Sequence, residues 1–223
     1  GTANLLCWFR MGEDDATGAD GVVDNSANSN HGIMEGSMDS GDIEATFPSS
    51  ISYTWADTLS MDFDGSDEFI SVSANQADFH FNSTPGAGGD DSPFSISIWA
   101  KMDDASDFRM ISVGSDTSRS WTFGFRGDDR LEVWFNSEAT STDYIREIAD
   151  SASTADEGAW HQYAMTYDGS ETAAGITLYR DGSSIASSES SGGSYSGLRQ
   201  VTALNIGRWN GVANANGKMN EAS

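Results

Sequence analysis

Four oxygen-bearing side chains lie within one polar stretch of the sequence, at Asp24, Asn25, Asn28 and Asn30. A hard cation such as calcium binds several oxygen ligands at short range, from carboxylates, amides and backbone carbonyls. This spacing therefore predicts a calcium site in the loop. The alternative is a turn in which the Asp and Asn side chains hydrogen bond only to their own backbone.

A second group of residues has the chemistry of a sugar site, which combines aromatic surfaces with polar groups that bind hydroxyls. The candidate ligand-binding residues are Trp121, Arg126, Trp134, Trp209 and Asn210, on strands or loop edges with polar neighbours. For each tryptophan, packing in the core is the alternative. The amide-rich tip at 210–217 suits either a binding loop or a plain turn.

The histidines do not indicate nucleophilic catalysis. His31, His80 and His161 have no nearby motif that supplies both a nucleophile and an orienting carboxylate. We therefore predict no catalytic residue and a protein that is not an enzyme.

The strongly acidic composition excludes some classes of binding partner. The 223 residues include 35 Asp and Glu against 11 Lys and Arg, which gives a formal net charge of −24. Binding to nucleic acid or to an anionic membrane needs a cationic surface, so neither is expected. Cys7 is the only cysteine, which excludes an intrachain disulfide and favours a small buried hydrophobe. No apolar stretch is long enough to span a membrane.

The candidate residues must be positioned by short strands. In the run 160–167, Trp160, Gln162, Ala164 and Thr166 alternate with His161, Tyr163, Met165 and Tyr167. Both sets contain large side chains, so we expect this strand in the middle of a stacked β structure with both faces covered.

Further strands are predicted at 5–11, 22–23, 31–38, 94–102, 108–114, 121–126, 131–135, 144–148, 176–180 and 203–209. This cadence suits an antiparallel sandwich of two sheets and leaves no room for crossover helices. Asp64-Gly65 and Asp181-Gly182 each predict a hairpin, and residues 74–93 form a long loop.

The run WHQYAMTYDG at 160–169 resembles the W-H-x-x-A-x-T-Y-D-G signature of laminin G-like, concanavalin A-like jelly-roll domains. Other segments follow that family's order, namely FRMGE, VVDNSANSNHGIMEG, LSMDFDGSDEFISV, FSISIWAKM, ITLYRDG, LNIGR and GKMNEAS. The resemblance implies one all-β domain over residues 1–223, an antiparallel jelly-roll sandwich of two stacked sheets. GKMNEAS resembles the opening of the family's last strand, so we expect a domain truncated there and part of a larger protein.

The resemblance also bears on the sites. Laminin G-like modules often hold a structural calcium with such a loop and an acidic residue near the C-terminus, which gives Asp24, Asn28, Asn30 and Glu221 as the predicted metal ligands. Some glucanases of this fold use three carboxylates with the spacing of Asp62, Asp64 and Asp67. The predicted turn at Asp64-Gly65 would break that row, which argues against an active site.

These observations together predict a non-enzymatic recognition or adhesion module that binds carbohydrate. The segments WFRMGEDD, DNSANSN, MDSGDI and GKMNEAS resemble those of laminin G-like modules in virion structural proteins of marine tailed phages. That resemblance implies a virion or extracellular location, with glycans or other virion proteins as partners. The alternatives are a capsid or fibre decoration protein that binds no glycan and, less favoured, a glycoside hydrolase.

Overall fold

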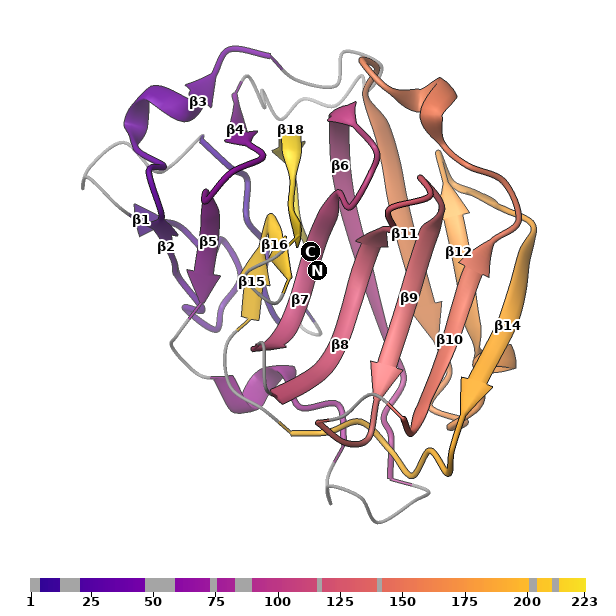
Figure 1. Cartoon of the computed structure of the whole chain (residues 1–223). Helices are drawn as coiled ribbons and strands as arrows, with labels where there is room; N and C mark the ends of the chain where they lie inside the picture. The colour runs from indigo at the N-terminus through magenta and orange to yellow at the C-terminus, as the bar shows by residue number, and fades with distance from the viewer. Residues whose placement is uncertain are drawn as a thin grey trace.

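The computed structural model describes residues 5–12, 21–46, 59–72, 76–82, 90–115, 118–139, 142–200, 204–209 and 213–223. Two large antiparallel sheets stack face to face (Figure 1). The predicted all-β sandwich is therefore confirmed. The helical segments in the described part are four short 3-10 turns, η1 (Ser40–Asp42), η2 (Gln76–Phe79), η3 (Thr154–Asp156) and η4 (Ala173–Gly175).

The larger sheet has nine strands. In spatial order they are β1 (Gly21–Val22), β2 (Gly32–Glu35), β5 (Phe69–Val72), β15 (Leu204–Ile206), β7 (Arg109–Ser115), β8 (Ser118–Phe125), β9 (Leu131–Asn136), β10 (Tyr144–Ala149) and β14 (Ser187–Gly192). A small two-stranded sheet consists of β16 (Arg208–Trp209) and β17 (Ala213–Asn214).

The second large sheet has seven strands. Their order is β13 (Ser183–Ser184), β12 (Ile176–Arg180), β11 (His161–Tyr167), β6 (Phe94–Asp104), β18 (Asn216–Asn220), β4 (Ser60–Asp64) and β3 (Ile43–Glu44). In Figure 1, β6, β11 and β12 lie behind β7 to β10.

Alternating side chains from both sheets fill the space between them. On β8, Phe123 and Phe125 are fully buried, and on β11 Met165 is too. Complete burial of one such side chain contributes about 1.5–3 kcal/mol. Cys7 joins this core, and burial, with a smaller contribution from Asp24, raises its pKa to about 12. The prediction that Cys7 is a small buried hydrophobe is confirmed.

Strand β11 lies between β6 and β12, as expected for a central strand. Its inward face carries Tyr163, Met165 and Tyr167, all buried. On the outward face, Thr166 is exposed and Gln162 is half-buried. The expectation that both faces are covered was therefore wrong, because β11 faces the other sheet on one side only.

One of the two predicted hairpins is present. Arg180 pairs with Ser183 across Asp181 and Gly182, whose φ angles of +50° and +76° suit a two-residue turn. At Asp64-Gly65 the prediction was wrong, because β4 and β5 belong to different sheets.

A connection of four residues, 65–68, carries the chain from one layer to the other. Gly65 adopts a φ of +76°, and the carboxylate of Glu68 accepts a 2.7 Å hydrogen bond from the backbone N–H of Asp64. The buried positions Phe63 and Ile70 are seven residues apart, so the period-two alternation changes phase within this connection.

Two predicted strands differ in extent. The segment 5–11 forms only isolated bridges, with Phe9 pairing to both Asp24 and Ala222. The predicted strand 203–209 is divided at Gly207, whose φ of +86° separates β15 from β16. This division carries Trp209 out of the nine-stranded sheet.

Candidate functional site

The outward face of the nine-stranded sheet carries a cluster of aromatic residues. On β9, Leu131, Val133 and Phe135 point into the core, which leaves Trp134 on the outer face. The Trp209 ring lies 5.5 Å from the Trp134 ring, measured between centroids. The fold thus brings two of the predicted ligand-binding tryptophans together.

Hydrogen bonds hold β16 over this face. The Ser112 hydroxyl on β7 donates to the backbone oxygen of Arg208 at 2.7 Å, and the N–H of Gly207 donates to the oxygen of Met110 at 3.0 Å. Arg208 and Gly207 are the two residues that directly precede Trp209 in the chain. These bonds hold the backbone from which the Trp209 side chain projects.

Arginines from three different strands surround the two indoles. The guanidinium carbons of Arg109 and Arg119 lie 4.9 Å and 5.1 Å from the centroid of the Trp209 ring. The guanidinium carbon of Arg146 lies 5.5 Å from that of Trp134. Each distance is within the range of a cation–π interaction.

Glu132 lies at the centre of this arrangement and is 1% exposed. Its carboxylate is 3.2 Å from Arg109, 3.3 Å from Arg146 and 3.8 Å from Arg126. The third contact connects Arg126, another predicted ligand-binding residue, to the same cluster. We name this set the arginine–tryptophan layer: Arg109, Arg119, Arg126, Arg146, Glu132, Trp134 and Trp209.

Several polar atoms in and beside the layer are buried. Within the described part of the chain, Trp134 Nε1, Arg109 Nε, Arg146 Nε and Thr122 Oγ1 have no hydrogen-bond partner. Thr122 and Trp134 are cross-strand partners, so two of these atoms belong to neighbouring side chains. Buried polar groups normally have partners, so these atoms are exceptions in this part of the sheet.

Two predicted ligand-binding residues do not join the layer. Trp121 lies on the inner face of β8, is 2% exposed and packs near Phe81 and Phe94, with ring centroids 6.2 Å and 5.9 Å away. This is the core-packing alternative. Asn210 lies outside the described residues.

Asp24 organises the predicted calcium loop from within. Its carboxylate accepts hydrogen bonds of 2.8 Å from the backbone N–H groups of Trp8, Ser26 and Asn30, and from the Ser26 hydroxyl. Each oxygen thus accepts two hydrogen bonds. This geometry corresponds to the turn alternative for Asp24.

Asn28 and Asn30 point instead toward a group of oxygens on the N-terminal segment. Their Nδ2 atoms lie 2.8 Å from the Leu5 oxygen and 2.9 Å from the Leu6 oxygen, respectively, and that of Asn30 is 3.3 Å from an Asp78 carboxylate oxygen. Asn30 Oδ1 is buried without a partner in the described part of the chain. Rotation of either amide would turn its oxygen toward this group, so the donor set fits a hard cation.

The remaining predicted metal ligand, Glu221, lies just after β18 with a φ of +48°. Its neighbour Ala222 pairs with Phe9, which also bridges Asp24. The described residues contain no group of three or more His, Cys, Asp or Glu side chains placed to hold a metal. Calcium binding therefore stays a prediction, and Asp78 is a candidate ligand that the sequence did not suggest.

The three carboxylates with glucanase-like spacing have separate partners. Asp62 pairs with Lys218, Asp64 accepts from the N–H of Ser66 at 2.7 Å, and Asp67 accepts from the Ser37 hydroxyl at 2.7 Å. His161 is bonded to Asp181 at 2.7 Å at the end of the β12–β13 hairpin. Each of these groups thus has a local structural contact.

Stacked antiparallel sheets with these connections define a concanavalin A-like sandwich protein. A family model described as "Concanavalin A-like lectin/glucanases superfamily" matches residues 64–223. The chain belongs to this superfamily, which confirms the resemblance to laminin G-like and concanavalin A-like domains. Comparison with curated proteins gave no match.

Solved structures show the same fold at low sequence identity. The receptor-binding domain of botulinum neurotoxin C/D mosaic serotype is 15% identical, with a TM-score of 0.62, over 97% of this chain and 46% of that one. The binding domain of Paraclostridial Mosquitocidal Protein 1 is 15% identical, with a TM-score of 0.62, over 99% and 48%. The chain thus spans about half the length of these toxin domains.

A third similar structure matches over most of its length. Domain 4 of AbnA, a GH43 extracellular arabinanase from Geobacillus stearothermophilus, was solved in complex with arabinotriose. It is 13% identical, with a TM-score of 0.58, over 97% of this chain and 89% of that one. Binding domains are thus common to these neighbours, although the superfamily also includes glucanases. Within the described residues, no helix has the length and apolar character needed to cross a membrane.

Proposed function

We propose that this chain is a non-enzymatic carbohydrate-recognition module and that the arginine–tryptophan layer is its binding surface. The observation that carries the proposal is the convergence of Trp134 and Trp209 with arginines from three strands on one sheet face. The layer gathers four of the nine arginines of a chain whose net charge is −24.

The chemistry of the layer favours a sugar that carries a carboxylate or sulfate. Guanidinium groups donate in pairs to planar or tetrahedral oxyanions, and they need no deprotonation to do so. The indoles of Trp134 and Trp209, both half-buried, supply apolar surface for a sugar ring. Glu132 holds Arg109 and Arg146 in place, so the donors are positioned before a ligand arrives.

The neighbours support a role in binding. The toxin domains are described as binding or receptor-binding domains, and the arabinanase domain was solved with a trisaccharide. We further propose that the module binds its partners on an extracellular or virion surface. The sequence segments that resemble phage structural proteins support this location. The module's partners there would be glycans.

A glycan array that includes neutral, uronic-acid and sulfated saccharides tests the proposal. We expect binding to acidic glycans that weakens as salt is added, since partly exposed charges are screened. Arg119→Ala and Trp209→Ala should each lower the affinity at least about tenfold, the equivalent of one good contact.

Two matched variants serve as controls. Arg130→Ala removes a guanidinium that pairs with Asp128 at 2.7 Å, and Tyr179→Ala removes an aromatic ring from β12 in the other sheet. Both should retain wild-type binding. Binding that survives Arg119→Ala and Trp209→Ala would contradict the assigned surface, and binding to no glycan would favour a capsid or fibre decoration protein.

We also propose a structural calcium ion at the Asn28–Asn30 end of the loop. The supporting observations are the carbonyls of Leu5 and Leu6, the Asp78 carboxylate and the buried Asn30 oxygen. When bound, calcium would join the N-terminal segment to η2 and so stabilise the fold.

A further inference from the structure

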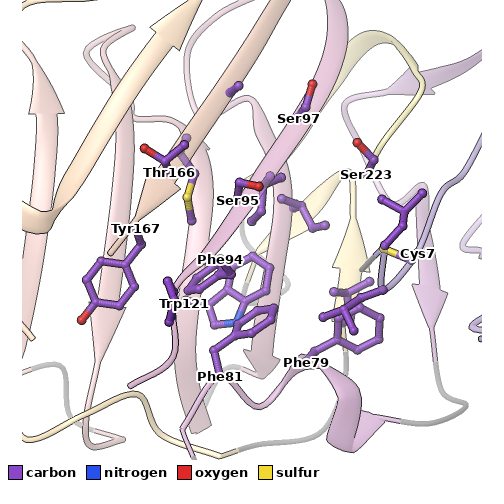
Figure 2. A pocket seen from close by; sticks show the side chains of 18 of the residues that line it. Cys7, Phe79, Phe81, Phe94, Ser95, Ser97, Trp121, Thr166, Tyr167 and Ser223 are labelled. Atoms are coloured by element: carbon purple, nitrogen blue, oxygen red, sulfur yellow. The ribbon is translucent and has the colours of Figure 1, made fainter. Parts of the chain in front are cut away.

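The pocket in Figure 2 lies beside β6 and has a mainly apolar lining. Aromatic and aliphatic side chains form most of it, together with hydroxyl groups and the amide of Asn28. No arginine or lysine is among the described residues that line it. An acidic ligand would find no opposite charge there. The outer face of the nine-stranded sheet, in contrast, carries a group of arginines.

Strand β16 contacts two distant parts of that outer face. Its two side chains point in opposite directions, as neighbouring residues of a strand do. The Trp209 ring lies 5.5 Å from that of Trp134 on β9. The guanidinium carbon of Arg208 lies 4.4 Å from the centroid of the Phe69 ring on β5. Because β5 and β9 are four places apart in the sheet, β16 connects two aromatic sites that are roughly 19 Å apart.

Arg208 and Phe69 repeat the chemistry of the arginine–tryptophan layer on a smaller scale. Ile70 and Val72 on β5 are fully buried in the core, so Phe69 lies on the outer face. Phe69 and Arg208 are both half-buried. Their contact has the distance of a cation–π interaction, and a guanidinium stacked on a ring keeps N–H donors along its edges. These donors can bind an oxyanion.

Arg208 has no acidic partner within the described residues. Glu132 compensates Arg109 and Arg146 in the layer, whereas no described carboxylate forms an ion pair with Arg208. Glu35, which lies opposite Phe69 on β2, accepts a 2.9 Å hydrogen bond from the Ser71 hydroxyl. The chain has 35 acidic side chains, so a guanidinium fixed over a ring without one of them is suited to the acidic group of a ligand.

We propose that the ligand is an internal stretch of an acidic polysaccharide that crosses β16 in an extended form. This inference rests on the proposed function and extends its binding surface to Arg208 and Phe69. One acidic group of the chain binds Arg208, and units further along bind the layer around Trp209 and Trp134. A single sugar unit cannot reach from Trp134 to Phe69. Affinity therefore depends on chain length, because binding at one site raises the effective concentration of the chain at the other.

Titration calorimetry with oligomers of defined length tests this dependence. The probes are galacturonic acid oligomers of two and eight units, with heparin oligomers of the same lengths as sulfated counterparts. We expect the unchanged protein to bind eight units at least about tenfold more tightly than two, the gain of one good contact. Arg208→Ala should remove this gain and leave the binding of two units unchanged. Trp209→Ala should weaken the binding of both lengths.

Two further variants serve as controls. Arg130→Ala alters the net charge by the same amount as Arg208→Ala, and it should keep the full dependence on length. Arg208→Lys keeps the charge but lacks the planar fork of donors, so it should retain only part of the gain. The Ser112 hydroxyl bonds to the backbone oxygen of Arg208, so β16 should stay in place in both Arg208 variants, with unchanged melting midpoints.

The outcomes separate this inference from the proposed function. Equal affinities for two and eight units, or a length dependence that survives Arg208→Ala, would overturn the extended site and leave the arginine–tryptophan layer as the binding surface. If neither length of either oligomer binds the unchanged protein, the proposed function itself fails, and the extended site fails with it.

Discussion

The guanidinium of Arg109 lies 3.2 Å from the carboxylate of Glu132, and their side chains are only 5% and 2% exposed. Arg146 and Arg126 approach the other oxygen of the same carboxylate, at 3.3 Å and 3.8 Å. One buried acid thus compensates several guanidiniums beneath the proposed binding surface. Its removal would leave positive charges close together without a counterion.

Glu132→Gln should therefore lower the free energy of unfolding by about 3–5 kcal/mol, the usual cost of breaking a buried ion pair. Urea denaturation measures this loss. Asp128→Asn is the control, because Asp128 forms an exposed pair with Arg130 and should cost less than about 1 kcal/mol. Equal losses in the two variants would contradict a buried, charge-compensating role for Glu132.

The contribution of Glu147 to folding stability depends on pH. An acid in an ion pair contributes stability at high pH, whereas Glu147 contributes it at low pH. Burial, and to a smaller extent Glu189 directly opposite on β14, raises its pKa above the usual 4.5. The folded protein thus holds the proton more tightly than the unfolded chain. The stability due to this group is complete below the usual pKa and is lost as the pH rises through the raised one.

Glu147→Gln should accordingly raise the melting midpoint near neutral pH and change it little below the usual pKa of 4.5. Melting curves at two pH values show the difference. Glu189→Gln, which alters an exposed residue, should give a smaller effect of the same sign. A neutral-pH midpoint lowered by Glu147→Gln would show that the charged carboxylate is favoured in the fold.

Trp121 and Trp134 should respond differently to truncation. Trp121 is buried between the sheets, so Trp121→Ala should cost about 3–5 kcal/mol. Trp134 is half-buried on the outer face, and Trp134→Ala should cost less than half as much. Denaturant curves for the two variants test this order, and a larger loss for Trp134 would reverse our assignment of inner and outer faces.

Thermal melting with calcium and with excess chelator tests the proposed cation. We expect a higher midpoint with calcium, and a smaller difference in Asp78→Asn. Ionic strength must be matched, and magnesium compared, because a net charge of −24 makes any divalent cation stabilising through screening. Asp150→Asn, an exposed acid bonded to Ser188, is the control and should keep the full response. An identical midpoint with calcium and with chelator would remove the proposal.

The alternation of apolar and polar residues predicted which face of most strands is buried. It also separates the inward Trp121 from the outward Trp134, a distinction that our list of candidate ligand-binding tryptophans did not make. Trp121 shares its period with Phe123 and Phe125, which marks it as inward, whereas Trp134 shares its period with Glu132. The pairing of Trp134 with Trp209 was not predictable, because it depends on the bend at Gly207. Nor were Arg109, Arg119 and Arg146, which come from separate strands and meet only when the sheet forms.

The turn at Asp64-Gly65 shows a related limit. Asp-Gly between two apolar runs favours a hairpin whenever the flanking strands can pair. Here β4 pairs with β3 and β18, and β5 pairs with β2 and β15. The choice between sheets is made by distant partners, which local turn chemistry does not encode.

The outermost strands β13 and β14 end the two sheets with Ser183–Ser184 and with Ser187–Gly192, a run of serine, glutamate and glycine. Open edges bearing apolar side chains can add strands from other molecules and nucleate aggregates. These edges offer small hydroxyl groups and the charge of Glu189 instead, which bind water well and give a neighbouring sheet little to pack against. Many copies of the module could therefore be held close together on one surface and remain separate folding units.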